Sequence, residues 1–346
     1  MKIDFEVVEL VTRHAFHIAR EAAPPAWRTV WVRVRHEDGK EGWGEAAPSP
    51  FYGETADTVR AVMPRLAEAV TGSAGGDELS LERVEREVER AIGHHAAAKA
   101  GVSAALHDLA AKRLGVPLWR LLGLDPATAP RSSFTIGIDQ PEVMREKVRE
   151  AAAYQILKIK VGGSQDEEVL ALVRDQAPDK KLRVDANTSW TLKEAVRALP
   201  MLEEYGVELL EQPLHPDDLE GMRILRGRSR LPLIADESCR TSADVPRLAG
   251  AVDGVNLKLA KCGGIREAVR TLHAARAHGM EVMLGCMIES TLGIAAAIQI
   301  APLMDYLDLD GAALLAGDPF TGPGIGPDGV LRFNQEPGLG VARVAR

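Results

Sequence analysis

A chain of 346 residues, 46% of them hydrophobic and 27% charged, has the composition of an ordinary globular protein, and its length allows one large domain or two. The net charge of −8 argues against a nucleic-acid-binding surface, which needs a basic patch. No apolar run is long enough to predict a membrane span, no signal peptide is apparent, and the widely spaced cysteines indicate free thiols. We therefore expect a cytoplasmic protein with neither nucleic-acid nor membrane partners, and the oligomeric state stays open, a homo-oligomer included.

The first region, residues 1–125, has the pattern of an α+β domain. Three β-rich runs come first, at residues 5–10, 28–34 and 41–46. Asp38 and Gly39 lie between the last two runs and are a strong hairpin signal. Apolar residues spaced three or four apart then predict helices, the last of which ends at Gly115. Three strands are too few for the whole protein, so a second domain must follow.

From about residue 131, short strand-like runs alternate with helical stretches. The eight runs are SFTIGI, ILKIKV, KLRVDA, VELLEQ, PLIADE, GVNLKL, EVMLGCM and YLDLD. Helix-capping pairs follow three of them: Ser164 with Glu167, Thr191 with Glu194, and Thr241 with Asp244. Eight strands with short connections predict a parallel sheet, which is either a closed barrel or an open doubly wound sheet.

Polar residues at the ends of the predicted strands favour the barrel. Barrel enzymes gather side chains from many strand ends at one mouth, whereas an open sheet binds its ligand at one switch point, usually beside a glycine-rich loop. Nearly every strand here ends in an ionisable or polar residue, and no such loop follows the first strand. We therefore predict a catalytic β/α barrel over residues 126–315. The turn-rich segment 316–346 is expected to return to the first domain.

Charged and polar residues recur at these strand ends about 25 residues apart, which is one β/α unit. The set consists of Lys158, Lys160, Asp185, Asn187, Glu211, Asp236, Lys258, Asp308 and Asp310. Alternate residues of a strand share a face, so the members that lie two apart point in the same direction. A parallel strand that is buried on both faces should be almost entirely apolar, and repeated departures from that pattern indicate a functional site.

Three carboxylates on neighbouring strands, Asp185, Glu211 and Asp236, would repel one another unless a cation lay between them. Hard oxygen ligands favour Mg²⁺ over a transition metal. Surface acids at loop starts would account for any one of the three, but poorly for all of them beside two lysines. The pattern therefore predicts a Mg²⁺ site.

The lysines suggest proton transfer. A free lysine has a pKa of about 10.4, so a lysine that acts as a base needs its pKa lowered. The positive charges of Lys158 and of the metal would lower the pKa of Lys160. Lys261 lies three residues after Lys258, which in a regular strand would turn it away from the mouth, so we expect it to lie outside the site.

Taken together, these motifs resemble the enolase superfamily, in its muconate lactonizing enzyme subgroup. The motifs are GWGEA at 42–46, Lys158-Ile159-Lys160, Val184-Asp185-Ala186-Asn187, Glu211-Gln212-Pro213, Asp236-Glu237-Ser238 and Asn256-Leu257-Lys258. The resemblance covers nearly the whole chain. It implies a (β/α)7β TIM-like barrel with an α+β capping domain, which the N-terminal region and the C-terminal tail build together.

The resemblance also implies roles. Asp185, Glu211 and Asp236 would bind Mg²⁺, which in turn holds the carboxylate of the substrate. Lys160 and Lys258 would be the catalytic residues, placed on opposite faces of the substrate α-carbon so that one removes a proton and the other returns it. Lys158 would assist the base or contact the carboxylate.

The reaction within this superfamily depends on other positions. Asp308-Leu309-Asp310 resembles the Asp-x-Asp of dipeptide epimerases, where it binds the ammonium group of the N-terminal residue. The resemblance thus implies an isomerase that epimerises a dipeptide by 1,1-proton transfer through an enediolate. An N-acylamino-acid racemase or o-succinylbenzoate synthase remains the alternative.

The dipeptide itself stays open. Specificity is expected from two loops of the capping domain, at about residues 17–28 and 48–55. Arg20 in the first loop would favour an acidic side chain, whereas its neighbour Glu21 would suit a basic one. Asn187 and Cys286, the latter in the GCMIES run of the seventh strand, are further candidates for substrate contact.

Overall fold

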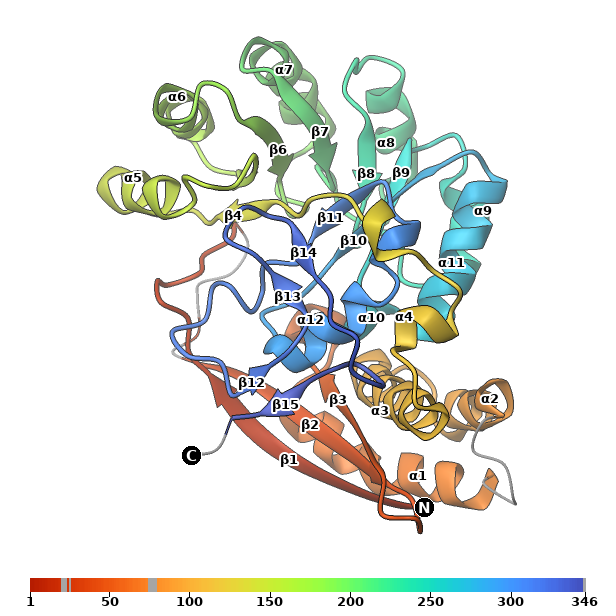
Figure 1. The fold of residues 1–346 in the computed structure, drawn as a ribbon. Coiled ribbons are helices and arrows are strands. Elements are labelled where there is room, and N and C mark those ends of the chain that lie inside the picture. The colour runs from red at the N-terminus through yellow and green to blue at the C-terminus, as the bar shows by residue number, and fades with distance from the viewer. Residues whose placement is uncertain (20–23, 25, 74–79, 345–346) are drawn as a thin grey trace.

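In a computed structural model of the protein, the described residues are 1–19, 24, 26–73 and 80–344. An antiparallel sheet with three helices forms one region, and a parallel β/α barrel forms the other (Figure 1). The predicted fold class, a barrel with an α+β capping domain, is confirmed. None of the helices in the described ranges is long and apolar enough to cross a membrane.

The capping domain is built on a three-stranded meander that packs against helices. Its elements are β1 (Lys2–Leu10), β2 (Trp27–Arg35), β3 (Glu41–Ala46), α1 (Ala56–Ser73), α2 (Leu81–Ala91) and α3 (Ala96–Leu114). Gly39 has a φ of +85° in the predicted hairpin turn, and Gly115 ends α3 in the left-handed conformation. β3 lies directly on α3, where a Cβ on Gly44 would come within 2.1 Å of the Gly101 carbonyl oxygen. The glycines of GWGEA therefore allow a close strand-to-helix approach.

Eight parallel strands form the barrel in chain order, from β4 to β11. They are β4 (Phe134–Ile136), β5 (Ile156–Lys160), β6 (Lys181–Asp185), β7 (Val207–Glu211), β8 (Leu233–Ala235), β9 (Gly254–Leu257), β10 (Glu281–Gly285) and β11 (Tyr306–Asp308). A parallel bridge between Ser132 and Leu307 joins the first strand to the last, with the Ser133 N–H 3.1 Å from the Leu307 carbonyl oxygen. The barrel is therefore closed by a short seam.

Helices connect the strands and cover the outside of the barrel (Figure 1). They are α5 (Pro141–Glu150), α6 (Asp166–Gln176), α7 (Leu192–Glu204), α8 (Leu219–Arg226), α9 (Val245–Leu248), α10 (Leu259–Cys262), α11 (Ile265–Ala277) and α12 (Thr291–Ile298), while α4 (Leu118–Leu121) precedes the barrel. The short 3-10 helices are η1 (Pro50–Tyr52), η2 (Pro126–Thr128), η3 (Ser242–Asp244) and η4 (Ala301–Leu303).

Two of the three predicted capping pairs are correct. Thr191 with Glu194 forms a capping box at α7, and Thr241 with Asp244 forms one at η3. The Ser164 pair is wrong, because α6 begins two residues later, at Asp166. The Asp166 carboxylate accepts the N–H groups of Gly162 and Gly163, which fixes the loop before the helix.

The C-terminal segment contacts both domains. Its strands are β12 (Phe320–Thr321), β13 (Gly324–Ile325), β14 (Leu331–Arg332) and β15 (Ala342–Arg343). The ring of Phe320 packs edge-on against Trp31 of β2, with 4.9 Å between centroids, and the Leu339 N–H donates to Asp108 of α3. On the barrel side, the Gly329 carbonyl oxygen accepts the Ser132 N–H beside the seam.

Candidate active site

Strand register brings the predicted residues together at one mouth of the barrel. Lys160 of β5 lies opposite Asp185 of β6, which lies opposite Glu211 of β7. A cavity of about 400 Å³ opens between this mouth and the capping domain. Its lining includes Lys158, Lys160, Asn187, Lys258, Asp308 and Asp310. Asp185, Glu211 and Asp236 are fully buried beneath them.

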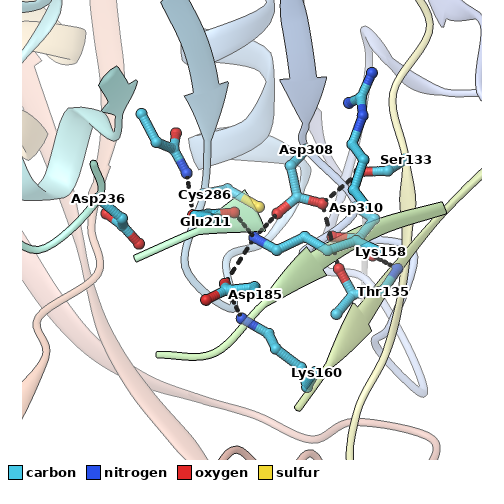
Figure 2. Close-up of polar contacts among 12 residues, drawn as sticks. Ser133, Thr135, Lys158, Lys160, Asp185, Glu211, Asp236, Cys286, Asp308 and Asp310 are labelled. Atoms are coloured by element: carbon cyan, nitrogen blue, oxygen red, sulfur yellow. Dashed lines mark hydrogen bonds and ion pairs between the residues drawn. The ribbon is translucent and has the colours of Figure 1, made fainter. Parts of the chain in front are cut away.

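Lys158 lies at the centre of the acidic cluster. Its Nζ is 3.0 Å from Asp185 Oδ2, 2.7 Å from Glu211 Oε2 and 2.7 Å from Asp308 Oδ2. Figure 2 shows the three carboxylates around it. Lys160 Nζ lies 2.6 Å from the same Asp185 oxygen. Burial alone would lower the pKa of Lys158, but the surrounding carboxylates outweigh burial and raise it well above its ordinary value. Lys158 therefore remains an ammonium group.

Asp236 is held between two lysines that follow β9. Lys258 Nζ is 2.7 Å from Asp236 Oδ2, and Lys261 Nζ is 2.6 Å from Asp236 Oδ1. The expectation that Lys261 lies outside the site is wrong. β9 ends at Leu257, and the single turn of α10 that follows carries Lys261 back beneath the strand end.

Asn256 is a residue that the sequence reasoning missed. Its Nδ2 donates to Glu211 Oε1 at 2.7 Å, so this side chain orients the Glu211 carboxylate. Asn256 lies two residues before Lys258 in the Asn256-Leu257-Lys258 motif, and this spacing is the signal that could have placed it on the inward face.

Asp308 and Asp310 line the cavity beside the β4–β11 seam, where Lys158 links Asp308 to the buried acids. Asp308 Oδ1 accepts the hydroxyl group of Ser133 at 2.7 Å, and Asp310 Oδ2 accepts the Thr135 N–H at 2.6 Å. Burial and the neighbouring Asp308 charge raise the pKa of Asp310 to about 7. Ser133 and Thr135 were also missed, because their contact with the last strand exists only once the barrel closes.

Both predicted capping loops line the cavity. Ile18 and Trp27 come from the first loop, and Pro48 and Glu54 come from the second. Arg20, which was predicted to contact the substrate, lies outside the described residues. Cys286 lines the cavity and accepts the Gly311 N–H through its Sγ.

The donor set suits a hard divalent cation. Glu211 Oε2 and Asp236 Oδ2 are buried and accept no hydrogen bond from any described residue, although a lysine nitrogen lies 2.7 Å from each. Over the described part of the chain, no three histidine, cysteine or carboxylate side chains are grouped closely enough to hold an ion as they stand. Lys158 and Lys258 contact these two oxygens, so an ion bound to the same oxygens would replace those two lysine contacts. The oxygen ligands themselves are those that Mg²⁺ prefers.

Both regions of the chain match known protein families. Residues 2–123 match the family model of the mandelate racemase / muconate lactonizing enzyme N-terminal domain, and residues 143–343 match that of the enolase C-terminal domain-like family. The chain belongs to the enolase superfamily. The expected membership is thus confirmed, and the two matches correspond to the capping domain and the barrel.

Individual members of this superfamily are similar over nearly their full length. The L-Ala-D/L-Glu epimerase of Bacteroides thetaiotaomicron is 38% identical over 99% of this chain and 88% of its own. The hydrophobic dipeptide epimerase of Roseobacter litoralis is 39% identical over 98% of both chains. The dipeptide epimerase of Enterococcus faecalis, solved with Mg and the dipeptide L-Leu-L-Tyr, aligns with a TM-score of 0.92 at 32% identity over 99% of each chain.

Proposed function

We propose that this member of the superfamily is a Mg²⁺-dependent dipeptide epimerase, an isomerase that inverts the α-carbon of the C-terminal residue. The observation that carries the proposal is the shared cavity, which is lined by Lys160, Lys258, Asp308 and Asp310 and lies over the buried carboxylates. Similarity to proteins named as dipeptide epimerases supports it.

The metal half would consist of Asp185, Glu211 and Asp236. When bound there, Mg²⁺ would hold the substrate carboxylate and supply the positive charge that stabilises the enediolate. Burial alone would lower the pKa of Lys258, but the Asp236 carboxylate raises it above its ordinary value. With Asp236 holding the ion, this carboxylate would stabilise the ammonium form of Lys258 less, and the pKa of Lys258 would be lower than it is here.

Lys160 and Lys258 would face the α-carbon from opposite sides. The neutral lysine accepts the α-proton, and the protonated lysine donates a proton to the other face of the planar carbon. One proton leaves the carbon and one arrives, so the two lysines exchange protonation states and return to their starting forms through solvent. Lys158 would remain charged and help to hold the substrate carboxylate, together with Asn187 at the cavity wall.

Asp308 and Asp310 would bind the substrate ammonium group. A dipeptide presents this group one peptide unit from the reacting carbon, whereas an N-succinyl amino acid presents a carboxylate, which two aspartates would repel. Cys286 would lie beside this end of the substrate, since its Sγ contacts Gly311, which follows Asp310. The capping loops, Arg20 included, would contact the side chains.

The test is solvent isotope exchange. The enzyme, Mg²⁺ and a panel of L,L-dipeptides are incubated in D₂O, and mass spectrometry measures deuterium at the C-terminal α-carbon while chromatography follows epimer formation. We expect exchange and epimerisation with at least one dipeptide. Absence of exchange with every dipeptide, combined with turnover of an N-succinyl amino acid or of an o-succinylbenzoate precursor, would replace this proposal by a racemase or synthase.

A further inference from the structure

Lys261 is a buried cation in the site to which the proton-transfer chemistry gives no role. Its Nζ lies 2.5 Å from the Asp236 carbonyl oxygen, 2.6 Å from Asp236 Oδ1 and 2.7 Å from the Asn256 carbonyl oxygen. An ammonium group has three hydrogens, and three acceptors are present. Lys261 is 1% exposed and does not line the substrate cavity, so it cannot reach a substrate atom.

These contacts fix the orientation of the Asp236 carboxylate. One carboxylate oxygen, Oδ1, is bound by Lys261, so the other, Oδ2, is directed toward Lys258 at 2.7 Å. Because Lys261 also binds the backbone carbonyl of the same residue, it fixes the side chain relative to its own strand end. Lys261 thus fixes the rotamer of Asp236 from a position outside the substrate cavity.

The same ammonium group reaches a second carboxylate through Asn256. Lys261 binds the Asn256 carbonyl oxygen, and the Asn256 side chain donates to Glu211 Oε1 at 2.7 Å. One lysine on α10 therefore orients carboxylates from β7 and β8, the first through a neighbour and the second directly. Carboxylates held this way have less freedom to lose when they coordinate an ion.

We propose that Lys261 is a positioning residue that pre-orients Asp236, and through Asn256 also Glu211, for binding of the divalent cation. The inference rests on the proposed function for the identity of the ion, but it concerns metal affinity and not proton transfer. Loss of the contact should weaken metal binding and leave dipeptide recognition at saturating metal largely unchanged.

The test compares Lys261→Met with Lys99→Met. Both remove the charge of a buried lysine, and both lysines border the same surface pocket, but the printed polar contacts of Lys99 are with Glu89 and not with Asp236 or Glu211. Isothermal titration with Mg²⁺ alone measures the dissociation constant, and differential scanning calorimetry of the metal-free proteins measures stability. We expect Lys261→Met to raise the dissociation constant at least tenfold, about 1.4 kcal/mol, and Lys99→Met to leave it within twofold. Raising Mg²⁺ should restore much of the kcat of Lys261→Met with little change in KM for the dipeptide.

A purely structural role predicts a different pattern. Lys261→Met would then lower the melting temperature, while the folded fraction would bind Mg²⁺ within twofold of the wild type, and this result would overturn the proposal. Should Lys261→Met not fold, Lys261→Gln replaces it under the same limits, because its amide can still donate one hydrogen bond. If wild-type protein binds Mg²⁺ but exchanges no dipeptide, the proposed function fails, whereas this inference is still decided by the metal titration.

Discussion

The carboxylates proposed to bind the metal and those proposed to bind the substrate ammonium group differ in their hydrogen-bond and ion-pair partners. At the metal end, each proposed ligand has a lysine nitrogen within 3.0 Å. Lys158 contacts Asp185 and Glu211, and Lys258 contacts Asp236. Beside the β4–β11 seam, Asp308 shares the Lys158 ammonium group with the first two of these acids, whereas Asp310 accepts the neutral backbone N–H of Thr135. On the proposed function, the lysines of the metal end would give up their contacts to Mg²⁺, while Asp310 would bind the ammonium group that arrives with the substrate.

The largest expected effect comes from the two lysines that would act as bases. Lys160→Met and Lys258→Met should each reduce epimerisation by roughly 10²–10⁴-fold at saturating Mg²⁺, because each removes one proton-transfer group. Deuterium exchange should persist from one epimer in Lys160→Met and from the opposite epimer in Lys258→Met. Epimerisation within tenfold of the wild type in either variant would contradict the two-base mechanism.

The next effect concerns the ammonium end. Asp310→Asn should lower kcat/KM for a free dipeptide by about 10²-fold, since loss of one partner of a buried ion pair costs about 2–5 kcal/mol. An N-acetylated dipeptide, which has no ammonium group, serves as the matched substrate and should be processed equally by both proteins. A similar loss with both substrates would show that Asp310 supports the fold and does not recognise the ammonium group.

The pH dependence of kcat/KM also tests Asp310, with a smaller expected effect. Because the pKa of Asp310 is raised to about 7, its carboxylate is charged above this pH and neutral below it. Ammonium binding should strengthen as the pH rises through 7, so kcat/KM at pH 6 should be about tenfold below its maximum. A falling limb follows near pH 8, where the dipeptide amine loses its proton. If the rising limb persists unchanged in Asp310→Asn, the titrating group is a different one.

The smallest expected effect is a shift in melting temperature on Mg²⁺ binding, which should distinguish the metal ligands from the residues that bind the ammonium group. At a concentration one hundred times the dissociation constant, Mg²⁺ stabilises the folded state by about 2.7 kcal/mol, which raises the melting temperature by several degrees. Asp310→Asn should retain this shift and Glu211→Gln should lose most of it. The glutamine variant should fold, because burial and Asp185 already raise the pKa of Glu211 to about 7. Equal shifts in all three proteins would exclude Glu211 as a ligand.

Much of the fold could be predicted because each local pattern agrees with the final structure. The hairpin turn at Gly39, the end of α3 at Gly115 and the eight barrel strands all follow from short-range spacing. The Ser164 cap failed since Asp166 competes for the same loop and takes the N–H groups of Gly162 and Gly163.

The site was predictable where a residue continues a regular strand and hidden where it does not. Asp185 and Glu211 follow from the recurrence of charged strand ends about one β/α unit apart. Lys261 was misplaced because the chain leaves β9 and turns into α10 before reaching it. Ser133 and Thr135 meet Asp308 and Asp310 across 173 to 175 residues of sequence, and no local pattern reports a contact of that range.

The seam between β4 and β11 brings together residues that lie far apart in the sequence, and the proposed ammonium end depends on it while the proposed metal end does not. Every carboxylate proposed for Mg²⁺ lies within residues 185–236, so that end can assemble from neighbouring strands. The ammonium end is complete only when Ser133 and Thr135 meet the last strand. The proposed metal end therefore draws on one stretch of the chain, whereas the proposed ammonium end depends on the contact that joins the first barrel strand to the last.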